Sequence, residues 1–246
     1  MEKDESEQIA ILNLFKVARI KGLYEGEALQ NEIKCHFLKA KKVKIKVTRG
    51  YNIFIDDGSS SEKDIFHHCI RVEGKDQERD IELLLHFPCL KNKHTAKRAR
   101  ANKVSVEEYI DTVFDVLKEI KNITNSKRNK NDISVRFYDD YAIRWRYYLF
   151  VDAKTNDKTL LLNYYDDSKS GADSAMLKVE FGAGTLCQDF DKRFDQIFSD
   201  EDYSKEIISN TKSSSRLVTK SICGHEKCIE KIEQLHLESF NNSRKA

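Results

Sequence analysis

The sequence predicts an α/β protein in which a mixed sheet is flanked by helices. Residues 43 to 47 alternate valine and isoleucine with lysine, the pattern of a strand with one buried face. Residues 80 to 87 form an almost continuous apolar run that stops at a proline, which is typical of a strand buried on both faces. Residues 105 to 120 place apolar side chains at helical spacing behind a capping box formed by Ser105 and Glu108. Buried strands together with amphipathic helices indicate a sheet covered by helices.

The rest of the first half is predicted to be mainly helical. Residues 7 to 20 have the spacing of a short amphipathic helix, which either docks on the core or serves a partner. Residues 26 to 41 predict a second helix with one apolar face, and residues 63 to 72 predict a third, shorter one. A lysine- and asparagine-rich connection at residues 122 to 131 is the best candidate for a boundary between two halves.

The second half is predicted to be rich in strands that are separated by turns of Asp, Asn, Ser and Gly. The expected strands cover residues 132 to 138, 144 to 151, 158 to 165 and 175 to 181. Residues 185 to 198 then predict a closing helix. We therefore expect three parts: a helical extension over residues 1 to 22, a main domain over residues 23 to 200, and a polar tail with a weak helix over residues 201 to 246.

Composition restricts the class of function. The 246 residues carry 43 Lys and Arg against 41 Asp and Glu, a net charge of +2, so any phosphate-binding surface must come from local clustering. No stretch approaches the roughly 20 apolar residues that cross a bilayer, and the first residues lack the layout of a signal peptide. We expect a cytoplasmic protein without membrane association, in which most of the six scattered cysteines are reduced and buried.

Two segments have the composition of a phosphate site. Residues 91 to 103 hold six Lys and Arg and no acid, and they follow the carboxyl end of a buried strand, where open α/β sheets place their ligands. Residues 166 to 174 combine hydroxyls, a lysine and a glycine between two predicted strands. Each segment also has an ordinary interpretation, the first as a solvated basic loop and the second as a plain hairpin.

Two further patterns leave alternatives open. Arg144 and Arg146 share one strand face and would bind an anion together if that face lined a cleft, but a solvated face opposite a buried Trp145 explains the pattern equally well. Cys223, His225 and Cys228 have the soft ligands of a zinc site, without a second close-spaced pair, so two ordinary thiols beside a histidine are the simpler interpretation.

The motifs of several large enzyme classes are absent from the sequence. It has no nucleophile elbow G-x-S-x-G, no G-x-x-x-x-G-K phosphate loop and no dinucleotide-binding glycine pattern. Residue patterns alone therefore assign neither an activity nor a cofactor, and we expect no cofactor and no metal.

Read in order, residues 23 to 200 resemble the phospholipase D-like fold, especially a divergent bacterial branch found as the sensing or effector half of larger proteins. The segments that carry the resemblance are KVKIKVTRG, IELLLHFPC with its basic run, VRFYDDYAIRWRYYLFVD, LLLNYYDDSKSGADSAMLKVEF and DFDKRFDQIFSDE. The resemblance implies a phospholipase D-like sandwich. It also implies pairing of such domains, as a homodimer or within a multi-protein system.

The chain departs from the active members of that family, in which two H-x-K-x4-D motifs meet across a cleft. No such motif occurs: Lys97 follows His94 at the wrong spacing, and the segment NYYDDSKSGADS has no histidine. A mechanism through a phosphohistidine is therefore unsupported. By position in the family, the anion-binding half of the site would persist, and the residues that line it would be Arg49, Arg98, Arg144, Tyr164, Ser168 and Ser174.

Two functions follow from this resemblance. The leading hypothesis is a sensor or effector module that binds a phosphorylated ligand, a nucleotide or nucleic acid, in bacterial defence or regulation. The alternative is a phosphodiesterase or nuclease with a rebuilt active site around Lys169, Asp173 and His94.

Overall fold

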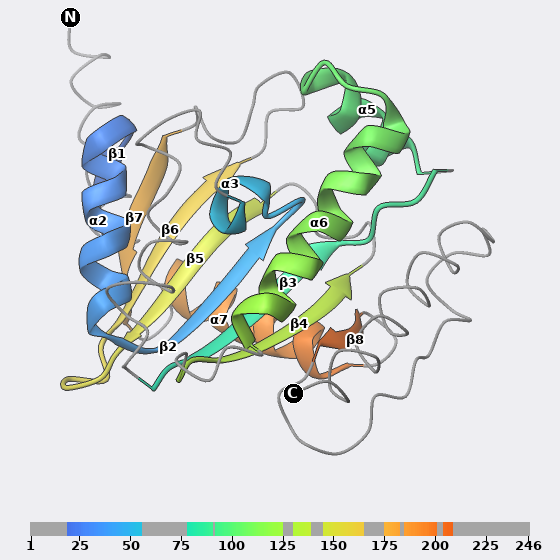
Figure 1. The fold of residues 1–246 in the computed structure, drawn as a ribbon. Coiled ribbons are helices and arrows are strands. Elements are labelled where there is room, and N and C mark those ends of the chain that lie inside the picture. Colours follow the sequence, from blue (N-terminus) through green and yellow to red (C-terminus); the bar gives the residue numbers. More distant parts are fainter. Residues whose placement is uncertain are drawn as a thin grey trace, which may run out of the picture.

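The computed structural model describes residues 19–55, 78–90, 92–124, 130–138, 145–164, 175–182, 185–200 and 204–208. Within these ranges, Asn52, Tyr164 and residues 205 to 208 are described by their backbone alone. The described residues form one eight-stranded sheet with helices on both faces (Figure 1). This architecture confirms the predicted α/β class with a mixed sheet flanked by helices.

The strands follow each other across the sheet in the order β1-β7-β6-β5-β2-β3-β4-β8. They are β1 (Ile20–Tyr24), β2 (Ala40–Val47), β3 (Asp80–His86), β4 (Asp132–Tyr138), β5 (Trp145–Asp152), β6 (Lys158–Tyr164), β7 (Met176–Glu180) and β8 (Ser204–Ile208). The central strands β2, β3 and β4 are parallel, and all other neighbours are antiparallel. As a result β1, β2, β3, β4 and β6 all finish at one end of the sheet, which we call the carboxyl edge.

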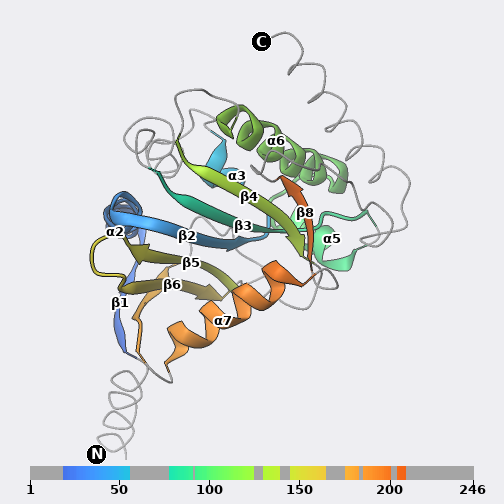
Figure 2. The same cartoon turned by 90° about the horizontal axis from the view of Figure 1, so that it is seen from below.

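Helices cover the two faces of the sheet unequally (Figure 2). One face carries α2 (Gly26–Lys39), α3 (Tyr51–Phe54) and α6 (Val106–Thr124), whose apolar side chains join the larger core cluster. The other face carries α7 (Leu186–Ser199), which packs on a second cluster. The remaining described helix, α5 (Lys93–Ala101), lies beyond the carboxyl edge beside α6. Every described strand between β7 and β4 is therefore covered by a helix on at least one face.

Helix α6 begins where its sequence predicts. The Ser105 hydroxyl accepts a hydrogen bond from the Glu108 N–H at 3.0 Å, and the Glu108 carboxylate accepts one from the Ser105 N–H at the same distance. This reciprocal capping box satisfies two backbone donors that a helix start otherwise leaves without a partner.

Strand β2 sits at the centre of the sheet, where both of its faces are covered. Its apolar residues Val43, Ile45 and Val47 join the larger core, as the alternating pattern predicts. The lysines between them point to the α7 side and are buried as well, with Lys44 5% and Lys46 1% exposed. A strand that looks half-solvated in the sequence is therefore buried on both sides.

The sheet extends past both expected limits of the main domain. Residues 20 to 24 form β1 and pair with β7 within the segment expected to lie partly in the helical extension, and residues 204 to 208 form β8 and pair with β4 within the expected polar tail. Both are short edge strands whose pairing depends on distant residues, so local pattern gives little signal for them. The expected helix at residues 7 to 20 lies outside the described residues up to residue 18, and its last residue, Ile20, is instead the first residue of β1. The expected helix at residues 63 to 72 and the weak helix of the tail, expected near residues 225 to 240, lie outside the described residues.

Candidate functional site

The carboxyl edge is the part of the fold from which both predicted phosphate-binding segments leave the sheet. The basic segment follows β3 and the predicted hairpin follows β6, and both strands end at this edge. Strands β5 and β2 stand between them, so three spacings of about 4.8 Å separate the two strand ends by roughly 14 Å. The two departure points are therefore neighbours on one edge of the sheet.

The structure describes only some of the predicted site residues. Arg49, His94 and Arg98 are described with their side chains, and Tyr164 is described by its backbone at the end of β6. The others lie outside the described residues: Arg144, Ser168, Lys169, Asp173 and Ser174. Convergence of the hairpin and the basic segment on one hollow therefore stays a prediction.

Arg49 follows β2, and its side chain contacts residues of α3, of α6 and of the basic segment. Its guanidinium lies 4.8 Å from the ring centroid of Tyr51 and 5.3 Å from that of Tyr109. It also donates hydrogen bonds to Asn102 Oδ1 at 3.2 Å and to Thr112 Oγ1 at 3.4 Å. Because Asn102 belongs to the predicted basic segment, the structure does bring Arg49 to that segment, but in contacts that stabilise the fold.

The basic segment itself is mostly helix, where the sequence suggested a loop. The Asn92 side chain caps α5 by accepting a hydrogen bond from the His94 N–H at 2.7 Å. Arg98 is buried at 5% exposure, while His94 is half-buried, and its Nδ1 has no hydrogen-bond partner among the residues that the structure describes. The segment lacks an apolar stripe because its buried positions are Thr95, Arg98 and Ala99, and this is why periodicity does not reveal the helix.

The simpler interpretation of the sequence, a buried Trp145 opposite a solvated arginine face, is wrong for Trp145 and Arg146. Arg146 is buried, and its guanidinium lies 5.9 Å from the ring centroid of Tyr148 on the side of the larger core. Trp145 is 39% exposed and stands on the α7 side, in edge-to-face contact with Phe190 at 5.7 Å. The indole, rather than the arginine, is thus accessible at the carboxyl edge.

A cavity of about 310 Å³ opens beside this indole, between the sheet and α7. We call it the aromatic cavity, and its lining includes Lys46 from β2, Trp145 and Tyr147 from β5, and Asp189, Phe190 and Arg193 from α7. Its volume is at the lower end of the range, roughly 300 to 1,000 Å³, of small-molecule sites. Aromatic walls with two cations and one acid suit a planar ligand that carries negative charge.

Lys46 is a buried and strongly perturbed group in the aromatic cavity. Its Nζ donates a hydrogen bond to the backbone oxygen of Trp145 at 2.9 Å and lies 4.5 Å from the ring centroid of Tyr138. Burial disfavours the ammonium form and lowers the pKa of Lys46 to about 7. Near neutral pH this side chain therefore exists in both protonation states.

Tyr147 stands beside Lys46 as its cross-strand neighbour, with Nζ 5.9 Å from the ring centroid. Its hydroxyl is buried and has no hydrogen-bond partner among the residues that the structure describes. Burial raises the pKa of Tyr147, so the phenol keeps its proton at neutral pH. Such a buried hydroxyl is available to a ligand that fills the cavity.

Sequence reasoning missed Lys46 because its burial depends on α7, which lies some 140 residues further along the chain. The signal that could have revealed it is the pair Asp191 and Asp195, one helical turn apart on the predicted closing helix. Both carboxylates accept hydrogen bonds from Lys44 Nζ at 2.6 Å and so bring α7 over the lysine face of β2.

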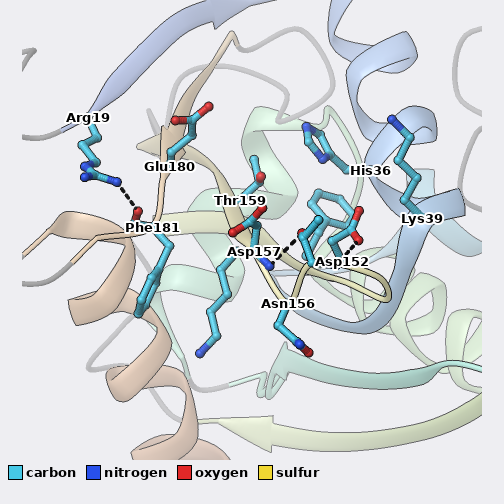
Figure 3. Close-up of a pocket in the computed structure, with 12 residues that line it drawn as sticks. Arg19, His36, Lys39, Asp152, Asn156, Asp157, Thr159, Glu180 and Phe181 are labelled. Atoms are coloured by element: carbon cyan, nitrogen blue, oxygen red, sulfur yellow. Dashed lines mark hydrogen bonds between the residues drawn. The ribbon is translucent and has the colours of Figure 1, made fainter.

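A second cavity, of about 440 Å³, lies at the opposite edge of the sheet between the end of α2, the β5–β6 turn and the end of β7 (Figure 3). Its charges are largely engaged in internal contacts. Arg19 donates a hydrogen bond to the Phe181 oxygen at 2.7 Å, the Asp152 carboxylate accepts two from N–H groups of its own turn, and Lys158 pairs with Asp191. We therefore favour the aromatic cavity as the functional site.

Metal binding and membrane insertion find no structural support in the described residues. Among them, no group of three or more His, Cys, Asp or Glu side chains could hold a metal ion. No helix in the described part of the chain combines the length and the apolar character needed to cross a membrane. The cysteine and histidine pattern at Cys223, His225 and Cys228 lies outside the described ranges.

Comparison with known proteins gives no assignment. No model of a known protein family matches the chain, and a search of curated proteins finds no match.

Proposed function

We propose that this protein binds a phosphorylated ligand, a nucleotide or the end of a nucleic acid, in the aromatic cavity at the carboxyl edge. The observation that carries the proposal is the combination of Lys46 and Arg193 with the accessible rings of Trp145 and Phe190 in one cavity. Cations hold phosphate oxygens, and aromatic faces stack on bases, each stack contributing about 1 to 3 kcal/mol.

The position of the cavity supports this proposal. Ligands of open α/β sheets bind beyond the carboxyl ends of the parallel strands, and Lys46 is the penultimate residue of β2, one of the three parallel strands. Asp189 is the acid that lines the cavity. Two cations and one acid leave one net positive charge when Lys46 is protonated, and this balance favours a singly or doubly charged phosphate over a neutral ligand.

The proposal extends to the family that the sequence resembles. An α/β fold with a mixed sheet is compatible with a divergent phospholipase D-like domain, and a binding module is consistent with a chain that has no H-x-K-x4-D motif. On this proposal the protein is a cytoplasmic sensor or effector in bacterial defence or regulation, acting as a homodimer or within a multi-protein system. It responds to nucleotides or nucleic acid without consuming them.

The chain contains its own reporter for the test. Trp145 is the single tryptophan of the sequence and borders the cavity, so its fluorescence reports binding directly. Titration with adenosine 5′-monophosphate should change this fluorescence, and adenosine, which lacks the phosphate, should bind at least about ten-fold more weakly because a charge-assisted hydrogen bond contributes about 1.5 to 3 kcal/mol. A 5′-phosphorylated single-stranded oligonucleotide should bind better than its 5′-hydroxyl counterpart.

A matched pair of variants tests the role of charge. Arg193→Gln removes a cation from the cavity lining, whereas Lys192→Gln removes one from an exposed neighbouring position of α7. We expect the first variant to weaken binding of adenosine 5′-monophosphate by about 10- to 100-fold and the second to leave it within two-fold. Equal effects of the two variants, or no response of Trp145 to any phosphorylated probe, would contradict the proposal.

The same samples decide between a binding module and an enzyme. A labelled single strand, a duplex and a general phosphodiester are incubated with the protein, with and without divalent metal. Turnover that is lost in Lys169→Ala would favour the phosphodiesterase built on Lys169, Asp173 and His94. Binding without turnover favours the sensor.

A further inference from the structure

The aromatic cavity holds a lysine and a tyrosine whose arrangement suits covalent chemistry. We propose that Lys46 is a nucleophilic amine that takes a planar aldehyde into the cavity as an imine, with Tyr147 as the proton donor. This goes beyond the proposed function because it assigns a reaction, with a carbonyl compound as the co-reactant, to a cavity so far considered only for binding.

The geometry places the two groups side by side. Lys46 on β2 and Tyr147 on β5 are cross-strand neighbours, and both are almost completely buried, at 1% and 2% exposure. The Trp145 backbone oxygen accepts a hydrogen bond from Nζ at 2.9 Å and so fixes the direction of the amine. The Tyr147 hydroxyl, buried without a partner among the described residues, completes an amine and acid pair that lines the same cavity.

The walls of the cavity favour an imine over free amine and aldehyde. The rings of Trp145 and Tyr147 each contact Phe190 edge to face, with centroid distances of 5.7 Å and 5.1 Å. An imine is lost by reaction with water, and an apolar aromatic surround limits the access of water. The same rings accept a flat, conjugated ligand by stacking.

The reaction balances with water as the only by-product. The lone pair of the neutral Nζ forms a bond to the aldehyde carbon, and the carbonyl oxygen becomes a hydroxyl that takes one amine proton. This hydroxyl then leaves as water with the proton of Tyr147, and the remaining amine proton returns to the phenolate. One carbon–oxygen double bond is replaced by one carbon–nitrogen double bond, and no oxidant or reductant is needed.

The protonation states agree with these roles. About half of Lys46 is neutral at pH 7, whereas an ordinary lysine is neutral in only about three parts in ten thousand. Within the described ranges, the ionisable groups around its Nζ include the phenols of Tyr138 and Tyr147 on β4 and β5, and the cavity lining adds Asp189 and Arg193 on α7. Burial keeps the Tyr147 phenol protonated, as a proton donor requires.

Two aldehydes test the inference on the unmodified protein. The protein is incubated at pH 7 with pyridoxal 5′-phosphate or with benzaldehyde, the imine is reduced with cyanoborohydride, and the modified lysines are mapped by mass spectrometry. We expect Lys46 to be modified at least ten-fold faster than Lys154, an exposed lysine in the β5–β6 turn that serves as an internal reference. Modification by either aldehyde supports the inference.

Lys46 modified no faster than Lys154 by both aldehydes would overturn the inference. The rate at Lys46 should also rise with pH up to about 8 and then level off. Tyr147→Phe should slow modification of Lys46 without moving the midpoint of its pH profile, and an unchanged rate would remove Tyr147 from the reaction. The nucleotide titrations with Trp145 fluorescence are independent of this result, so the two proposals can fail separately.

Discussion

Replacing Lys46 by methionine should stabilise the protein, and the gain should shrink as the pH rises. Methionine has a similar length and no charge, so it fills the same space between β5 and α7 without placing an ammonium in an apolar environment. The substitution isolates the electrostatic cost of one buried lysine at the centre of the sheet.

The magnitude follows from the lowered pKa. The value of 10.5 for an ordinary lysine falls to about 7 at Lys46, and each pKa unit corresponds to about 1.4 kcal/mol. Below pH 7 both states of the chain hold the proton, so the cost of the buried ammonium is present in full and reaches about 5 kcal/mol. Between pH 7 and 10.5 the unfolded state binds more protons than the folded state, so wild-type stability rises with pH.

The difference in the free energy of unfolding between Lys46→Met and wild type should therefore fall by about 2 to 3 kcal/mol between pH 6 and pH 9. Urea denaturation at several pH values, followed by circular dichroism, measures this difference. Subtracting the two proteins cancels the other titrating groups, which they share.

Lys44→Met is the matched control on the same strand. Lys44 Nζ lies 2.6 Å from carboxylate oxygens of both Asp191 and Asp195, so its loss leaves a buried carboxylate short of one partner and should destabilise the fold by about 2 to 4 kcal/mol. We expect the free energy of unfolding to rise in Lys46→Met and to fall in Lys44→Met. Changes of opposite sign at two neighbouring buried lysines would distinguish the cost of burying an ammonium from the loss of an ion pair. Parallel pH curves for wild type and Lys46→Met would refute the reasoning.

Three other substitutions test individual contacts. Ser105→Ala removes the capping box shared with Glu108 and should lower the free energy of unfolding by about 1 kcal/mol, and urea denaturation without such a loss would contradict the capping role. Arg49→Lys keeps the charge but loses the planar stacking and the hydrogen bond to Asn102, which should lower the thermal midpoint by a few degrees. Trp145→Ala should weaken binding of adenosine 5′-monophosphate by about 5- to 100-fold in isothermal titration, and unchanged affinity would exclude stacking on this indole.

The sequence predicted the elements whose signal is local. The apolar run of β3, the alternation in β2 and the capping box of α6 each identify their element within a few residues. The edge strands β1 and β8 escaped prediction because each has only five residues and gains its stability from pairing with strands far along the chain. Helix α5 was not predicted because an arginine and a threonine occupy its buried face, so the sequence shows no apolar stripe there.

The candidate site was less predictable than the fold. Residue patterns indicate which positions share a strand face but not which face a helix covers. The burial of Lys46 and the exposure of Trp145 both depend on where α7 packs on the sheet. A buried lysine and a solvated one look alike in a strand that alternates with valine. The hairpin residues Ser168, Lys169, Asp173 and Ser174 stay predictions.

The placement of β2 between β3 and β5 has a consequence for the order of folding. The partner of β2 on one side follows it within about 40 residues, but its partner on the other side comes about 100 residues later. During synthesis, one edge of β2 must therefore wait for β5 to leave the ribosome. Such non-local pairing slows folding, and we expect fragments that end near residue 130 to expose an incomplete sheet and to aggregate.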